Sequence, residues 1–312
     1  MNIIPNNTDF DFFGKRRFGY ILSAILIVLS VGSLAIKGLN YGLDFTGGVL
    51  IEAGYQQPAD LDAIRDTLAQ RDLNDAVVQF FGSSTSVIVR LPPAQDENQA
   101  ELSSRVLSAL QAQDPNVEMR RVEYVGPAVG KELIEAGGLA VIMVLAGILI
   151  YVGFRFELRL AAGAILALIH DLLIVLGIVS LLGIEFNLTV LAAFLALAGY
   201  SINDTIVIFD RIRETFQKLR KGTEQRVMNV AINQTLARTV VTSGTTILTL
   251  LALLIFGGEA LFGFALVLLM GVILGTYSSV FVASALSLDM GLKRTDLIKA
   301  EVKEEGNIDD RP

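Results

Sequence analysis

The 312-residue sequence contains no cysteine and a single histidine, His170. Without cysteine the chain has no disulfide, no thiolate nucleophile and no cysteine-based metal site. With one histidine it cannot build a histidine-rich metal site either. Charged residues are also scarce, at 18% of the chain, whereas hydrophobic residues make up 53% and the mean hydropathy is +0.57. This composition favours a membrane transporter or a membrane scaffold over a soluble enzyme.

Six stretches are long and apolar enough to cross a bilayer. We predict spans over Phe18–Ile36, Leu133–Phe154, Leu158–Leu182, Leu188–Phe209, Val240–Phe256 and Leu261–Leu288. The first stretch follows Lys15, Arg16 and Arg17, which is also how a signal peptide begins. Because it is longer than the usual apolar core of a signal peptide, we interpret it as a span and keep a cleaved leader as the alternative.

Positive charge gathers on one side of these spans. The loops on that side contain Arg155, Arg159, Arg211, Arg213, Lys218, Arg220, Lys221, Arg226, Lys293 and Arg294. The short loops opposite, Gly183–Asn187 and Gly257–Ala260, have no Lys or Arg. The positive-inside rule therefore places both termini in the cytoplasm and the long segment after the first span outside.

These signals divide the chain into four parts. We expect the cytoplasmic N-terminus and first span over 1–36, an exterior domain over 37–132, the remaining spans over 133–288 and a cytoplasmic tail over 289–312. Between the fourth and fifth spans, Thr223 is a good N-cap for a helix over 223–237. Its apolar strip predicts an amphipathic helix on the cytoplasmic membrane surface, with a plain helical connector as the alternative.

Residue patterns in the exterior domain predict the order βαββαβ. The strands are expected over Gly48–Tyr55, Ala76–Phe81, Thr85–Leu91 and Val117–Val125, and the helices over 58–71 and Gln95–Gln111. This order is that of a ferredoxin-like α+β fold.

The whole net charge of −7 lies outside the spans. Lys37–Glu135 has eight Lys and Arg against fifteen Asp and Glu, and the rest of the chain balances. An acidic surface does not attract nucleic acid. It favours a basic or unfolded polypeptide, or it is simply a solvated face.

Two residues of opposite charge interrupt the spans: Asp204 in the fourth and Arg238 beside the fifth. A charge near the bilayer centre costs about 2.5–3.5 kcal/mol on insertion scales, so such residues favour a functional interpretation. If Arg238 moves toward and away from Asp204, the carboxylate can release and bind a proton. A static buried ion pair that fixes helix packing is the alternative.

Threonines follow Arg238 at helical spacing. They are Thr242, Thr245, Thr246 and Thr249. Because they share one face of a helix, they predict a polar path or a helix contact. In the alternative interpretation each hydroxyl bonds the carbonyl one turn back in its own helix.

His170 and Asp171 lie in the third span, about 17 Å from its cytoplasmic start and thus near the midplane. Adjacent residues point about 100° apart on a helix, so we expect different neighbours for the two side chains. We predict that the pair belongs to a proton relay and assign neither residue alone.

Several segments carry a resemblance to a known family. They are YGLDFTGG (Tyr41–Gly48), VGPAVGKEL (Val125–Leu133), FRFE (Phe154–Glu157), HD (His170–Asp171), GYSINDTIVIFDRIRE (Gly199–Glu214) and RTVVTSGTT (Arg238–Thr246). In this order they resemble the SecD/SecF family of bacterial protein-export membrane proteins, part of the resistance-nodulation-division superfamily.

The resemblance implies a polytopic α-helical membrane protein of the bacterial inner membrane, half of a transporter, with six spans and a ferredoxin-like periplasmic domain. It implies that the chain pairs with a related half, SecD, and associates with the SecYEG channel and YajC. The complex would use protons as the coupling ion, without a bound cofactor, to draw preproteins outward. Asp204 and Arg238 match the family's key intramembrane acid and arginine.

Other functions compete with protein export. A small-molecule or lipid efflux half-transporter of the same superfamily is one alternative, although a single exterior domain is small beside the porter domains of drug exporters. A passive assembly factor, in which Asp204 and Arg238 only pack helices, is another. An enzyme fits least, because the sequence has no nucleophile elbow, phosphate loop or metal cluster.

Overall fold

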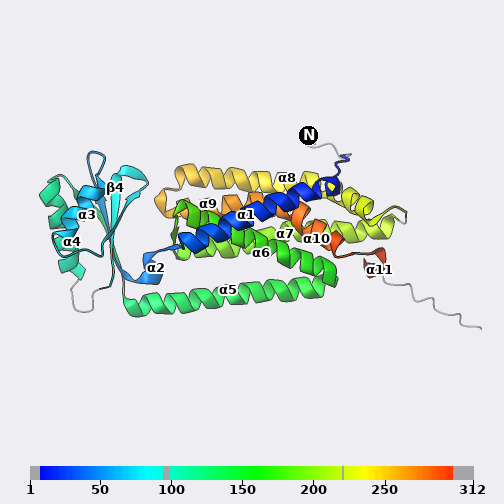
Figure 1. Cartoon of the computed structure of the whole chain (residues 1–312), viewed down its shortest axis with the longest axis horizontal. Coiled ribbons are helices and arrows are strands. Elements are labelled where there is room, and N and C mark those ends of the chain that lie inside the picture. Colours follow the sequence, from blue (N-terminus) through cyan, green and yellow to red (C-terminus); the bar gives the residue numbers. More distant parts are fainter. Residues whose placement is uncertain (1–7, 94–98, 220, 298–312) are drawn as a thin grey trace, which may run out of the picture.

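The computed structural model describes residues 8–93, 99–219 and 221–297. Figure 1 shows an elongated molecule in which a bundle of long helices carries a small α+β domain at one end. Six helices of the described part are long and apolar enough to cross a membrane. They are η1–α1 (Phe13–Lys15 and Arg16–Ile36), α5 (Pro127–Arg155), α6 (Leu158–Leu182), α7 (Leu188–Lys218), α8 (Glu224–Phe256) and α9 (Glu259–Ser278) with its continuation η2 (Ser279–Ala283) and α10 (Ser284–Asp289). The predicted polytopic helical architecture is confirmed.

Local chemistry sets the ends of the third and fourth spans. Gly183 follows α6 in the left-handed conformation (φ 66°), which glycine adopts without the Cβ penalty. The Asn187 side chain then caps α7 by accepting a hydrogen bond from the Val190 amide at 2.9 Å. Only a five-residue connection separates the two helices, so they lie antiparallel and share a core.

The predicted surface helix over 223–237 is not a separate element. Thr223 caps α8 as expected, with its hydroxyl accepting from the Arg226 amide at 3.3 Å. The helix then continues without a break into the fifth span, because no glycine or proline interrupts the sequence before Gly244. Its apolar residues Val227 and Ala231 are buried in the main core of the bundle.

The α+β domain follows the predicted order of elements. Its parts are β2 (Gly48–Gly54), α3 (Leu61–Ala69), β3 (Val77–Phe81), β4 (Ser83–Leu91), α4 (Gln99–Gln113) and β5 (Glu118–Val125). The four strands pair antiparallel in the order β3-β4-β2-β5, which is ferredoxin-like topology. Apolar residues of α3, α4 and one face of the sheet form its core, which includes Ile51, Ile64, Leu68, Val89 and Leu110.

A short junction joins this domain to the bundle. The two-residue strand β1 (Asn40–Tyr41) pairs in parallel with β6 (Glu185–Phe186), and the short helix α2 (Leu43–Thr46) follows. A carboxylate oxygen of Asp44 accepts from the Leu188 amide at 2.8 Å, at the start of α7. From the domain, Arg90 reaches Glu185 at 2.8 Å and the Tyr41 carbonyl at 2.8 Å. The junction therefore fixes the domain to the end of the bundle.

At the opposite end of the bundle, the segment before α1 packs on α8. The Asn233 side chain accepts from the Phe10 amide at 3.0 Å and donates to the Phe10 carbonyl at 2.9 Å. One turn earlier, Asn229 accepts from the Phe12 amide at 3.1 Å. Two adjacent turns of α8 thus hold an extended backbone segment by its peptide groups. The final short helix, α11 (Arg294–Leu297), lies at this same end (Figure 1).

Candidate functional site

Asp204 lies on α7 in the interior of the bundle, only 3% exposed. Its contacts come from α8 and α9: the Ser243 hydroxyl is 3.5 Å from its carboxylate and the Thr276 hydroxyl 3.4 Å. Both contacts are long, and both hydroxyls have shorter alternatives. Thr276 lies 2.9 Å from the Val272 carbonyl, and Ser243 lies 2.7 Å from Thr276. The Asp204 carboxylate is therefore buried and weakly hydrogen-bonded.

Arg238 does not pair with Asp204 in this conformation. The guanidinium is on α8 and its residue is exposed. No ion pair joins it to a carboxylate anywhere in the described ranges of the chain. The two predicted residues thus sit on neighbouring helices, with the acid inside the bundle and the arginine at its surface.

The threonines of α8 bond within their own helix. Thr242 donates to the Arg238 carbonyl at 2.9 Å, and Thr246 donates to the Thr242 carbonyl at 3.0 Å. The bonds of Thr245 and Thr249 are 2.9 and 3.1 Å long and also end on carbonyls three or four residues back. Thr245 and Thr249 are exposed. Thr242 and Thr246 are half-buried, and the Tyr200 hydroxyl of α7 donates to the Thr246 hydroxyl at 3.4 Å, so the stripe lies partly on the bundle surface and partly against α7.

His170 and Asp171 are buried on α6 and contact each other. His170 Nδ1 lies 2.9 Å from Asp171 Oδ1, a contact that was not predicted, whereas the other neighbours of the two side chains differ as expected. The imidazole ring therefore contacts the side chain of the residue that follows it in the same helix. On its other side, His170 Nε2 lies 3.0 Å from the Ser23 hydroxyl of α1.

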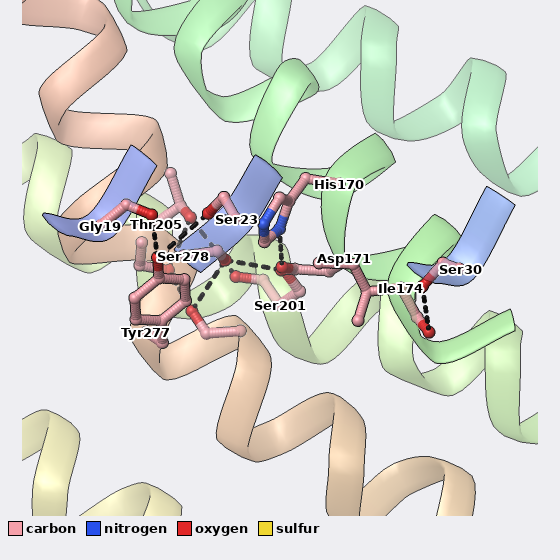
Figure 2. A network of polar contacts seen from close by, with 12 residues as sticks. Gly19, Ser23, Ser30, His170, Asp171, Ile174, Ser201, Thr205, Tyr277 and Ser278 are labelled. Carbon is pink, nitrogen blue, oxygen red and sulfur yellow. Dashed lines mark hydrogen bonds and ion pairs between the residues drawn. The ribbon is translucent and has the colours of Figure 1, made fainter. Parts of the chain in front are cut away.

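The second carboxylate oxygen of Asp171 is strongly hydrogen-bonded. It accepts from Ser201 of α7 at 2.6 Å and from Ser278 of α9 at 2.7 Å. Figure 2 shows how these groups from four helices converge around the His170–Asp171 pair. Tyr277 of α9 extends the chain, with its hydroxyl 3.0 Å from Ser23 and 2.6 Å from the Gly19 carbonyl.

The hydroxyl partners of Asp171, Asp204 and His170 were not predicted from the sequence. One signal pointed to some of them: Thr276–Ser279 is a run of four polar residues inside an otherwise apolar span. Ser23 stands alone among apolar neighbours, Ser201 lies in the polar segment Gly199–Thr205, and a serine in a membrane helix commonly bonds its own backbone. Only the packing of α1 and α7 against α6 shows that these two bond across helices.

A π-helical turn follows this polar run. In η2 the Ser279 hydroxyl contacts Thr205 of α7 at 2.8 Å. Opposite it, Gly163 of α6 lets the helices meet closely, because a Cβ there would lie 2.6 Å from the Ala283 carbonyl. Wide turns of this kind often occur near functional sites. Nowhere in the described chain do three His, Asp or Glu side chains gather in a way that could hold a metal ion.

The chain matches two family descriptions. Residues 105–293 match "Protein export membrane protein SecD/SecF, C-terminal", and residues 32–59 match "SecD/SecF GG Motif". Curated relatives named protein translocase subunit SecF include one from Vibrio alginolyticus, 49% identical over 99% of both chains. One from Pseudomonas aeruginosa is 49% identical over 97% of both, and one from Escherichia coli O157:H7 is 45% identical over 95% of this chain and 93% of its own.

Solved structures give the same result. The crystal structure of SecDF from Thermus thermophilus superimposes with a TM-score of 0.83 at 39% identity, over 92% of this chain. A structure of SecDF in the super-membrane-facing form gives 0.67 at 40% identity, over 91%. This chain spans 39% of the length of each of those solved chains. By matching family, length and fold, the chain belongs to the SecD/SecF family of protein export membrane proteins.

Proposed function

We propose that this chain couples the proton-motive force to preprotein export, as one half of a transporter whose other half is SecD. The observation that carries the proposal is Asp204, a buried carboxylate with long hydroxyl contacts and, among the described residues, no cation within ion-pair distance. A carboxylate in such a place is costly to keep ionised, so it binds a proton readily until a cation approaches.

Arg238 supplies that cation. At 4 Å and an effective dielectric constant of 20, two unit charges attract by about 4 kcal/mol, which favours the ionised carboxylate. In this structure Arg238 is exposed at the bundle surface and makes no ion pair with Asp204. Movement of α8 against α7 would bring the two together and release the proton. One charge crossing 100 mV supplies about 2.3 kcal/mol for such a step.

The surface of α8 that carries Arg238 is where we place the SecD half. Val240, Val241 and Leu248 on this helix are exposed, as are Thr245 and Thr249. An arginine and a threonine stripe facing lipid are unfavourable, so a protein partner is needed to cover them. The proton path would then run between the two halves, with the Thr242, Thr245, Thr246 and Thr249 stripe on its wall.

The charge asymmetry of the loops sets the orientation. Arg155, Arg159, Arg211 and Arg213 lie at the end of the bundle opposite the α+β domain. We therefore place that end and both termini in the cytoplasm of a bacterium, and the acidic domain in the periplasm. There the domain can meet preprotein leaving the SecYEG channel, with YajC as a further associated subunit.

The test is export of a secreted protein in cells whose only copy carries Asp204→Asn. This change keeps the side-chain size and removes the titratable group, so we expect export to fall on the order of tenfold or more, equivalent to about 1.4 kcal/mol. Asp210→Asn is the matched control, because Asp210 is on the same helix but pairs with Arg155 in a half-exposed site. Undiminished export in Asp204→Asn, with normal membrane levels, would leave Asp204 a packing residue.

A further inference from the structure

A continuous chain of hydrogen bonds fixes where protons sit around His170. It runs from the Gly19 carbonyl to Tyr277, Ser23, His170 and Asp171, with no link longer than 3.0 Å (Figure 2). Each hydroxyl in the chain has one proton to donate. One end of this chain is a group that can only accept a hydrogen bond, and this fixes the direction of every hydrogen bond in the chain.

That end is the Gly19 carbonyl. Because a carbonyl has no proton, Tyr277 must donate to it. The contact between Tyr277 and Ser23 then uses the proton of Ser23. With that proton engaged, Ser23 can only accept from His170, so Nε2 of the ring carries a proton.

The contact between His170 Nδ1 and Asp171 Oδ1 needs one proton more. If it sits on nitrogen, an imidazolium faces a carboxylate; if it sits on oxygen, a neutral ring faces a carboxylic acid. Both arrangements have the same number of protons and no net charge. The other oxygen of Asp171 is an acceptor from Ser201 and Ser278, so it offers no competing place for this proton.

We propose that His170 and Asp171 form a second proton-binding site, separate from Asp204, in which Tyr277 and Ser23 fix the ring with Nε2 protonated. The pair shares a proton between Nδ1 and Oδ1. Its release leaves a neutral ring and a carboxylate, hence one buried negative charge, and puts two acceptors face to face 2.9 Å apart. The assignment of the protons stands by itself, whereas any role of this proton in transport rests on the proposed function.

Within the part of the chain that the structure describes, the site has no hydrogen bond in common with the other titratable groups nearby. On α7, Asp204 contacts Ser243 and Thr276. On α1, Tyr20 donates to Asp289, which ends α10 at the end of the bundle opposite the α+β domain. Tyr277 is the one further titratable group in the hydrogen-bonded chain, and it acts there through its hydroxyl proton.

The sequence itself provides the test, because His170 is the only histidine. The full chain, purified without a histidine tag, labelled with ¹⁵N-histidine and placed in lipid nanodiscs, gives one pair of ring nitrogen signals. Protonated and unprotonated imidazole nitrogens resonate far apart. We expect Nε2 at the protonated position and Nδ1 at a protonated or shared position. A signal for Nε2 at the unprotonated position would overturn the proposal, and a signal for Nδ1 at the unprotonated position would contradict the shared proton.

A variant of Tyr277 tests whether this residue fixes the protonation of the His170 ring. In Tyr277→Phe the proton of Ser23 is no longer engaged and can be donated to the ring, so the Nε2 signal should shift toward the unprotonated position. Ser33→Ala is the matched control: Ser33 also joins α1 to α6, through Ser180 at 3.0 Å, but lies outside the chain. An unchanged Nε2 signal in Tyr277→Phe would show that the tyrosine does not fix the protonation of Nε2.

Two further variants separate this site from Asp204. Asp171→Asn removes the shared proton, so Nδ1 should move to the unprotonated position while Nε2 stays protonated. Asp204→Asn should leave both signals in place, and a shift of either would contradict two separate sites. None of these spectra depends on export. The proton assignment at His170 can therefore fail while the proposed function stands, and the proposed function can fail while the proton assignment stands.

Discussion

At the scale of single residues, the bundle treats its two buried acids in opposite ways. Asp171 receives short hydrogen bonds from two serines and faces a histidine, whereas Asp204 has only contacts of 3.4 Å or longer. Two titratable groups in contrasting surroundings suit different tasks. The well-bonded acid suits holding a proton in a fixed geometry. The weakly hydrogen-bonded acid suits exchanging a proton when the positions of neighbouring helices change.

The first strand of the α+β domain, β2, begins at a glycine whose backbone conformation other residues rarely adopt. Gly48 has φ 115°, and a Cβ there would lie 2.1 Å from the Leu91 carbonyl. Gly48→Ala should therefore destabilise the domain by at least about 2 kcal/mol, measurable as faster hydrogen exchange of β2 amides in the full chain. Gly126→Ala is the control, because φ there is −65° and the nearest atom, the Tyr124 hydroxyl, is 3.5 Å away. Equal exchange in the two variants would contradict the steric argument.

At the scale of elements, the spans and the order of the domain were predictable because periodicity and caps are local. Leu158–Leu182 is the clearest case, since the predicted span and α6 have the same ends. The β1–β6 pair was not predictable: two residues on each side carry no pattern, and they meet only because α6 and α7 place Glu185 beside Asn40. Asp204 could be identified as an unusual charge. Its distance from Arg238 depends on tertiary packing, which no spacing in the sequence encodes.

Because α8 is continuous, the segment before α1 is attached to the same helix that carries Arg238. Asn233 holds the backbone of Phe10 on the same rigid helix that carries Arg238 one and a half turns later. Asn233→Ala removes both bonds to Phe10, each worth about 0.5–1.5 kcal/mol. We expect the amides of residues 9–12 to exchange roughly tenfold faster in the full chain, measured by mass spectrometry.

The neighbouring residue provides the control for this prediction. Gln234 points away and accepts from Arg211 at 2.8 Å on the surface. Gln234→Ala should therefore leave exchange of residues 9–12 unchanged. If Asn233→Ala gives the same exchange rates as Gln234→Ala, the contact with α8 does not hold the segment.

At the scale of the whole molecule, transport requires that movements inside the membrane reach the α+β domain. Between them lies a cleft of about 450 Å³, lined by Glu52 and Glu123 from the sheet and by Glu185 and Glu259 from the bundle. Beside the cleft, the turn at Gly82 lies close to Glu259 of α9, and β5 leads directly into α5. The junction formed by β1, β6 and α2 adds a further connection, in which Arg90 is the main polar link.

Removing the charge of Glu185 should loosen that link. The Arg90 side chain is buried to about nine-tenths, so Glu185→Gln leaves a guanidinium with one carbonyl partner and no counter-charge. Breaking a fully buried pair in this way costs about 3–5 kcal/mol, and the partial exposure of Glu185 reduces the expected cost to roughly 1–3 kcal/mol. Spin labels on β5 and on the end of α9 would measure the result as a broader distance distribution between domain and bundle.

The control for this measurement is Glu123→Gln. Glu123 pairs with Arg121 on the surface of β5, where both side chains are well exposed, and such pairs contribute little. Its distance distribution should match that of the unmodified chain. If Glu185→Gln also leaves the distribution unchanged, the pairing of β1 with β6 and the Asp44 cap hold the domain without Arg90. If the distribution broadens while each part stays folded, export should fall as well, because the domain would no longer follow the helices.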